Sequence, residues 1–359
     1  MKQFQNCFLG RRILLTGHTG FKGSWLALWL TELGAQVTGL SLSPVGQLNH
    51  WNMLGLTIDE RILDIRNASS VRHVVEDVRP EIVFHLAAQP LVRKSYDEPC
   101  ITWDTNVMGT VNLLEACRLV NCVRAIVVVT TDKVYLNQEW AWGYRETDRL
   151  GGYDPYSASK AAVELVVESY RKSFYMMQGF PLIATARAGN VIGGGDWSED
   201  RLVPDLIRSI EARQTLQIRS PLATRPWQHV LECLSGYLLL GQKLFAREDY
   251  CDDSWNFGPS ADSNCSVVDF LKQISAYWPE LAWDIIQNQG PHEANFLYLD
   301  TSKVRVNLGW KSVWNLAQAI VHTTDWYHAF FASRQINSRE QLRRFISDAQ
   351  VCGCIWIES

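Results

Sequence analysis

The stretch that decides the fold is Gly17-His18-Thr19-Gly20-Phe21-Lys22-Gly23, which spells G-x-x-G-x-x-G. It joins an apolar run expected to be a strand, residues 12–16, to an amphipathic segment expected to be a helix, residues 22–33. Glycines at such a turn allow a tight bend and a close backbone approach to a pyrophosphate, and the free N–H groups of the helix start face the phosphates. An ordinary strand-to-helix turn would also use glycine, but this placement favours a dinucleotide site.

Short β-rich runs alternate with helical patterns through the first half of the chain. The expected strands cover residues 12–16, 36–40, 81–85, 125–130 and 182–187. The expected helices lie around residues 22–33, 67–78, 99–120 and 155–178. This alternation predicts an α/β fold with a doubly wound, Rossmann-like parallel sheet.

The pattern changes at a glycine-rich run, residues 188–197. We predict a dinucleotide-binding domain over 1–187, and a smaller substrate-binding lobe over 188–332 from which some segments return to the first domain. Helices of the lobe are expected at about 203–213, 230–245 and 266–276. The tail over 333–359 is assigned no role.

The composition excludes several classes of partner. The charged fraction is 20% and 34 basic against 38 acidic residues give a net charge of −4, so there is no basic field for nucleic acid or an anionic membrane surface. The chain start lacks a signal-like apolar run, and Glu32 and Gly34 interrupt the next apolar stretch, so we expect a cytoplasmic protein. The nine cysteines show no metal-binding spacing, so we predict no metal and a small-molecule partner.

The choice between NAD and NADP depends on the end of the second expected strand. The sequence there is Gly39-Leu40-Ser41-Leu42-Ser43, without the acidic residue that commonly holds the ribose of NAD. No Lys or Arg lies between Lys22 and Arg61 to pair with the phosphate of NADP. We therefore predict NAD, with Asp64 either near the adenine amino group or acting as a helix cap.

Two polar stretches suggest a catalytic site. Thr130-Thr131-Asp132-Lys133-Val134-Tyr135-Leu136 ends an apolar run, and Tyr156-Ser157-Ala158-Ser159-Lys160 follows an Asp-Pro helix start. Tyr156 and Lys160 are four apart on one helix face, where the ammonium and an oxidised nicotinamide would lower the pKa of the phenol. An exposed surface pair is the alternative for an isolated Y-x-x-x-K.

Together with His85-Leu86-Ala87-Ala88-Gln89 and Asn106-Val107-Met108-Gly109, these motifs resemble, in order and spacing, the extended short-chain dehydrogenase/reductase family. Residues 17–25, residues 131–135 and Arg225-Pro226-Trp227-Gln228-His229-Val230 are most similar to its nucleotide-sugar 4,6-dehydratases that act on CDP-glucose. The resemblance spans about residues 10–330.

The resemblance implies a lyase with internal hydride transfer. Tyr156, assisted by Thr131 and Lys160, would deprotonate the C4 hydroxyl as hydride passes to NAD; water is then lost across C5 and C6, and the hydride returns to C6. Asp132 matches the general acid for the C6 oxygen. Lys133 stands where dTDP-glucose dehydratases carry a glutamate base, so either Lys133 is the base or it stabilises an enolate while another group moves the proton.

The resemblance also implies which residues contact the cofactor and the nucleotide sugar, and that the chain forms a homodimer. The expected cofactor contacts, besides Tyr156 and Lys160, are Gly17, His18, Thr19, Gly20, Phe21, Gly23, Asp64, Ile65, Leu86, Ala87, Ala88, Asn106 and Thr130. The expected nucleotide-sugar contacts are Gln89, Asn190, Arg201, Leu202, Arg225 and Glu293. Helices around 99–120 and 155–178 would form a homodimer interface, and the pathway would be dideoxysugar synthesis for lipopolysaccharide O-antigen. The rival functions are a nucleotide-sugar 4-epimerase, a dehydratase for another base and a non-catalytic dinucleotide-binding protein.

Overall fold

A computed structural model describes residues 2–175, 180–260, 263–286 and 296–358. Its centre is a seven-stranded sheet with the order β12-β7-β6-β5-β2-β3-β4, in which all neighbouring strands run parallel. The strands are β2 (Arg12–Thr16), β3 (Gln36–Ser41), β4 (Asp59–Ile62), β5 (Ile82–His85), β6 (Ala125–Val129), β7 (Leu182–Ala188) and β12 (Ser254–Phe257). The predicted doubly wound sheet is confirmed, and its strand order reverses between β2 and β5, where such folds bind ligands.

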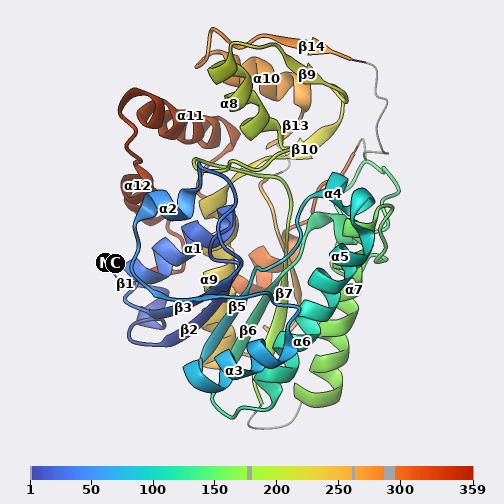
Figure 1. Ribbon diagram of the computed structural model, residues 1–359, viewed down its shortest axis with the longest axis vertical. Coiled ribbons are helices and arrows are strands. Elements are labelled where there is room, and N and C mark those ends of the chain that lie inside the picture. Colours follow the sequence, from blue (N-terminus) through green and yellow to red (C-terminus); the bar gives the residue numbers. More distant parts are fainter. Residues whose placement is uncertain (1, 176–179, 261–262, 287–295, 359) are drawn as a thin grey trace.

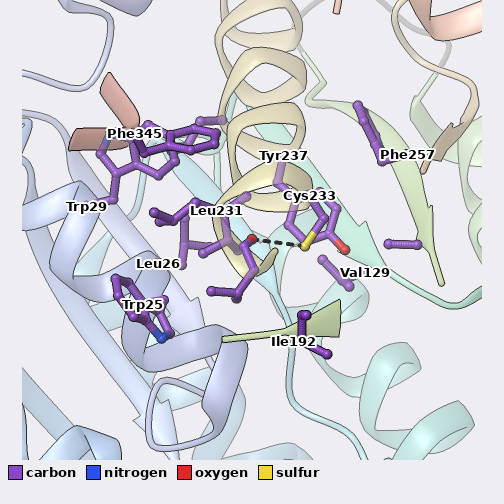
Figure 2. Packing of buried hydrophobic residues seen from close by; sticks show 14 of the residues in the cluster. Trp25, Leu26, Trp29, Val129, Ile192, Leu231, Cys233, Tyr237, Phe257 and Phe345 are labelled. Carbon is purple, nitrogen blue, oxygen red and sulfur yellow. Dashed lines mark hydrogen bonds between the residues drawn. The ribbon is translucent and has the colours of Figure 1, made fainter. Parts of the chain in front are cut away.

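Helices cover both faces of the sheet (Figure 1). One face carries α3 (Ala68–Val78), α6 (Gly109–Arg118) and α7 (Pro155–Tyr170), and the other carries α1 (Phe21–Glu32) and α9 (Val230–Ala246). Figure 2 shows side chains of α1 and α9 packed together in this second layer, among them Trp25, Trp29, Leu231 and Tyr237. The helix expected at 230–245 in the lobe therefore belongs to the layers around the sheet.

The segment expected to be one helix over 99–120 is divided. It contains α5 (Pro99–Trp103), one π-helical turn η2 (Asp104–Met108) and then α6. A short helix, α4 (Val92–Asp97), precedes it, and a second π-helical turn, η4 (Arg171–Tyr175), follows α7. Residues 176–178 of the helix expected at 155–178 lie outside the described residues.

The smaller lobe lies over the carboxyl ends of the strands (Figure 1). Its elements are α8 (Leu202–Ala212), β9 (Leu216–Ile218), β10 (Thr224–Pro226), β13 (Asn264–Ser266), α10 (Val267–Ser275) and β14 (Trp283–Ile285). Strand β9 pairs with β14 in parallel and β10 with β13 in antiparallel fashion, while β8 (Val191–Ile192) pairs with β11 (Gln228–His229) at the junction. Because α9 and β12 lie between lobe segments in the sequence, the chain crosses between the two parts several times.

The end of the chain covers the α1 side of the molecule. It contains η6 (Val304–Leu308), α11 (Leu316–Ser333), α12 (Ser338–Val351) and β15 (Ile357–Glu358), which pairs antiparallel with β1 (Lys2–Gln3). Trp356 stacks on Phe4 of the turn η1 (Phe4–Asn6), with ring centroids 5.0 Å apart. Helix α2 (His50–Leu54) packs on the same side against α1. Within the described ranges, no helix combines the length and apolar character needed to cross a membrane.

Candidate active site

A cleft of about 2060 Å³ separates the sheet from the lobe. On the side of the sheet it is lined by Gly17, Thr19, Gly20, Phe21, Gly23, Asp64, Ile65, Leu86, Ala87, Ala88, Gln89 and Thr130. The residues Thr131, Asp132, Lys133, Tyr156, Lys160, Asn190, Arg201, Leu202 and Arg225 also line it. The fold therefore brings together the dinucleotide loop, the two polar stretches and most of the residues expected to contact a sugar nucleotide.

The glycine loop fits the close packing that a pyrophosphate site requires. Gly17 has a positive φ of 77°, and a Cβ atom there would lie 2.8 Å from the nitrogen of Ala87. A Cβ on Gly23 would lie 2.0 Å from the carbonyl oxygen of Gly17, whereas one on Gly20 would meet only that oxygen, at 3.4 Å. Gly17 and Gly23 are therefore required by the turn itself, and Gly20 leaves the backbone open beside the helix start.

His18 does not line the cleft. Its side chain is fully buried, with Nε2 3.1 Å from Glu60 Oε2 and the ring edge-on to Trp51. It occupies the space above Gly39, where a Cβ atom would lie 2.5 Å from the ring. This side chain packs the loop against β3, and the contact expected between His18 and the cofactor stays a prediction. Burial lowers the pKa of His18, so the neutral ring is favoured.

Asn106 is also absent from the cleft wall, because it is buried within the π-helical turn η2. Its Oδ1 accepts a hydrogen bond from the backbone N–H of Gln89 at 2.8 Å, and its Nδ2 donates to the carbonyl of Gln89 and to Ser159 Oγ. Asn106 thus fixes the loop after β5 against α7, and its expected contact with the cofactor stays a prediction. Gln89 itself lines the cleft as expected.

Asp64 lies in the cleft wall and is not a helix cap. The side chain of Asn67 caps α3 by accepting from the N–H of Ser70 at 3.1 Å. Asp64 instead pairs with Arg66 at 2.6 Å, and hydrogen bonding to Arg66 lowers the pKa of the Asp64 carboxyl. The ionised carboxylate therefore presents hydrogen-bond acceptors in the wall of the cleft.

The short turn η3 (Asp132–Val134) places Asp132 and Lys133 in the wall of the cleft. Thr131 begins this turn, and its hydroxyl donates to Asp132 Oδ1 at 3.0 Å. Lys133 Nζ lies 3.4 Å from the same oxygen. Asp132 Oδ2 is buried without a hydrogen-bond partner among the described residues, and it faces the position of Gly189, where a Cβ would lie 3.0 Å away.

Tyr156 and Lys160 reach the cleft from the first turns of α7, which Asp154 caps by accepting from the N–H of Ser157 at 2.9 Å. In the protein alone, burial raises the pKa of Tyr156 to about 12, although a hydrogen bond with Thr131 lowers it in part. The lowering expected from Lys160 together with an oxidised nicotinamide stays a prediction. The ammonium of Lys160 donates to the carbonyl of Val129 at 3.2 Å.

The charge state of Lys160 depends on two further groups. Its pKa is lowered to about 8, chiefly by burial and then by the neighbouring charge of Lys22, whereas Glu164 raises it in part. Lys22 belongs to the glycine loop and lines the cleft. The phenol therefore needs additional positive charge in the cleft to ionise readily, which the oxidised form of a nicotinamide carries.

Glu164 joins this site to the sheet and was missed from the sequence. Its Oε1 accepts from the Thr130 hydroxyl at 2.5 Å, and its Oε2 accepts from Thr185 at 2.7 Å and from Arg187 Nη2 at 2.8 Å. Both ion-pair side chains are buried, at 3% and 2% exposure. The signal in the sequence was the position of Glu164 one turn after Lys160, on the same face of α7.

The lobe contributes both arginines and carboxylates to the cleft wall. Arg201, directly before α8, donates to Asp196 at 3.0 Å, and Arg225 lies on β10. Asn190 and Leu202 line the same part of the cleft, whereas Glu293 lies outside the described residues. Among the described residues, no group of three or more His, Cys, Asp or Glu side chains is placed to hold a metal ion.

The glycine loop, the ends of the parallel strands and the Tyr-Lys pair define a dinucleotide-dependent enzyme of the short-chain dehydrogenase/reductase class. The chain belongs to the GDP-mannose 4,6 dehydratase family, whose family model matches residues 14–323. Among its relatives, a CDP-glucose 4,6-dehydratase of Salmonella typhimurium is 44% identical over 353 residues, which cover 96% of this chain and 98% of the relative.

Solved structures support the fold. An epimerase of Methanothermobacter thermautotrophicus superposes with a TM-score of 0.82 at 23% identity, covering 92% of this chain and 95% of the other. A dTDP-glucose 4,6-dehydratase of Bacillus anthracis, solved in complex with NAD, gives a TM-score of 0.73 at 21% identity, covering 88% and 96%. At these identities the likeness establishes the architecture, which dehydratases and epimerases share.

Proposed function

We propose that this enzyme is a lyase that converts CDP-glucose to CDP-4-keto-6-deoxyglucose and water. The observation that carries the proposal is the Asp132-Lys133 pair in the same cleft as Tyr156 and Thr131. A carboxyl and an amine beside the oxidising pair supply what removal of water requires. The 44% identity to a CDP-glucose 4,6-dehydratase supports both the reaction and the base.

NAD is the cofactor, and the cleft offers groups to hold it. The turn at Gly17 and Gly20 would receive the pyrophosphate, Asp64 and Ile65 the adenosine, and Thr130, Tyr156 and Lys160 the nicotinamide end. When bound, NAD supplies a temporary store for the hydride that leaves C4 and later enters C6. The residues of the chain handle the protons and the developing charge.

Three side chains would handle the proton transfers. Tyr156 would take the proton of the C4 hydroxyl, helped by its hydrogen bond with Thr131 and by the positive charge of Lys160. Asp132 would donate a proton to the departing C6 oxygen. Lys133 would either remove the C5 proton as a neutral amine or stabilise the enolate that forms when another group removes it. Asn190, Arg201 and Arg225 would hold the sugar nucleotide.

A nucleotide-sugar 4-epimerase is the nearest competing function, because the same architecture serves both. An epimerase does not need an acid at C6, so the Asp132-Lys133 pair favours dehydration. The test is to incubate the protein with NAD and, separately, CDP-, UDP- and dTDP-glucose, and to follow each by mass spectrometry and NMR. Loss of one water from the CDP sugar alone is expected. A new epimer of unchanged mass would overturn the proposal.

We infer that the protein acts as a cytoplasmic homodimer in dideoxysugar synthesis for lipopolysaccharide O-antigen. Support for the dimer comes from large apolar side chains exposed on α5, η2 and α7: Ile101, Trp103, Met108 and Leu165 are 40–57% exposed. Such a group of exposed apolar residues is typical of a protein interface. Sedimentation equilibrium should give twice the chain mass, and Leu165→Asp should give monomers.

A further inference from the structure

Asp200 lies between two arginines that come from opposite sides of the cleft. Its Oδ1 is 3.2 Å from Arg93 Nη1 and 3.7 Å from Arg219 Nη2. Arg93 belongs to α4 beside the sheet, whereas Arg219 directly follows β9 of the lobe. All three residues line the cleft. One carboxylate thus connects the two walls of the substrate site.

The charges of this cluster do not balance. Arg208 of α8 pairs with Asp205. Burial raises the pKa of the Asp205 carboxyl, and the charges of Arg208 and, to a smaller extent, Arg93 oppose that rise. The cluster therefore contains three guanidinium groups and two carboxylates, an excess of one positive charge. Arg201, further into the cleft, has its own buried partner, Asp196.

The ion pairs of Asp200 with Arg93 and Arg219 are also accessible to water. The side chains of Arg93, Asp200 and Arg219 are 32%, 39% and 29% exposed, and water at such sites weakens an ion pair. A diphosphate carries more charge than one carboxylate and accepts the paired N–H groups of a guanidinium. Asp200 has a positive φ of 57°, which is uncommon outside glycine, so its carboxylate is placed between the arginines by a specific backbone conformation.

We propose that Arg93 and Arg219 bind the diphosphate of the sugar nucleotide, and that Asp200 occupies their guanidinium groups until the substrate displaces it. Asp200 is then an internal competitor of the substrate, and it keeps both arginines positioned across the open cleft. This inference rests on the proposed nucleotide-sugar function, and it adds a residue from the sheet side, Arg93, to the cations of the lobe.

The proposal predicts opposite effects for two substitutions. Calorimetric titration with CDP should show binding about 10-fold weaker for Arg93→Ala, since a charge-assisted contact is lost. Binding should become about 3-fold tighter for Asp200→Asn at low salt, and this gain should shrink as salt rises. In the double variant, which carries Arg93→Ala and Asp200→Asn, binding should tighten less relative to Arg93→Ala alone. The reason is that, without Arg93, removal of the Asp200 charge releases only Arg219.

Asp77→Asn is the matched control, because it removes the same charge from an exposed ion pair with Arg61 outside the cleft. Equal tightening in this control would overturn the proposal, as would weaker binding by Asp200→Asn or unchanged binding by Arg93→Ala. Inorganic diphosphate is titrated in parallel. If diphosphate follows the predicted pattern and CDP does not bind, the diphosphate site is supported and the proposed substrate is wrong.

Discussion

Asp132 holds the ammonium of Lys133 through one oxygen only: Oδ1 lies 3.4 Å from Lys133 Nζ, while the buried Oδ2 has no hydrogen-bond partner among the described residues. A buried polar atom left in this state costs roughly 1–3 kcal/mol. A hydroxyl of a bound ligand would satisfy it. The pair thus presents one oxygen that is occupied by Lys133 and one that is available for catalysis.

We predict that Lys133→Met stops the loss of water but leaves measurable hydride transfer to NAD. The substitution keeps the length of the side chain and removes the amine that is needed after the 4-ketone has formed. Absorbance of NADH reports the first step, and mass spectrometry reports the second. Lys172→Met, on the exposed end of the α7 region, is the control. Normal turnover of the Lys133 variant would remove this residue from the mechanism.

Tyr156→Phe should slow both NADH formation and product formation by roughly 100-fold or more, because general base catalysis contributes about 10²–10⁴ in rate. Binding of NAD and of the sugar nucleotide should change much less. Stopped-flow absorbance and calorimetry separate the two effects. Tyr250→Phe, at a side chain that is 85% exposed, should behave as the wild type. Unchanged activity of the Tyr156 variant would point to a binding protein.

Arg225→Ala should raise the Michaelis constant for the sugar nucleotide more than it lowers turnover. The reason is that a guanidinium holding a diphosphate binds the ground state and the transition state alike. Initial rates over a range of substrate concentrations give both quantities. A loss confined to turnover would show that Arg225 acts on the reacting sugar instead.

Glu164→Gln should destabilise the protein by roughly 3–5 kcal/mol, because it leaves the buried guanidinium of Arg187 without its charged partner. Equilibrium unfolding in urea measures this change. Glu168→Gln, one turn further along α7 in an exposed pair with Lys172, should stay within about 0.5 kcal/mol of the wild type. If the two variants are equally stable, the buried pair does not hold the site together.

Glu232 gives the stability a defined pH dependence. Burial raises the pKa of its carboxyl from 4.5 to about 8, although the N–H groups of Trp314 and Val313 lower it in part. Between these two values the folded state binds more protons than the unfolded state, so this contribution is complete below pH 4.5 and is lost as the pH rises to about 8. The melting temperature of the wild type, relative to Glu232→Gln, should fall across this interval. A constant difference would contradict the prediction.

The sequence predicted the sheet because its strands are short apolar runs next to diagnostic turns. It did not predict that residues 254–257 would join the sheet beside β7, since pairing between distant strands leaves no local pattern. The helix over 230–246 was placed in the lobe for the same reason: its sequence shows that it is apolar, but not which surface it covers.

Within the site, motifs predicted which residues would gather but not where each side chain would point. His18 and Asn106 occupy motif positions, yet they turn into the protein and support neighbouring backbone. The network around Glu164 was missed because its partners come from distant segments: Thr130 directly after β6, Thr185 and Arg187 on β7, and Ser254 on β12, whose hydroxyl donates to Glu164 Oε2 at 3.2 Å. Such contacts depend on the assembled sheet, and a single sequence does not report them.

The pairing of β1 with β15 places Lys2 directly opposite Glu358, on the α1 side of the molecule and away from the cleft (Figure 1). A short linker could therefore join these residues without crossing the substrate site. New ends could then be opened in an exposed loop such as the one around Tyr250. These two paired strands lie away from the cleft, so a chain joined there and reopened in an exposed loop would keep the residues of the cleft on the elements that position them.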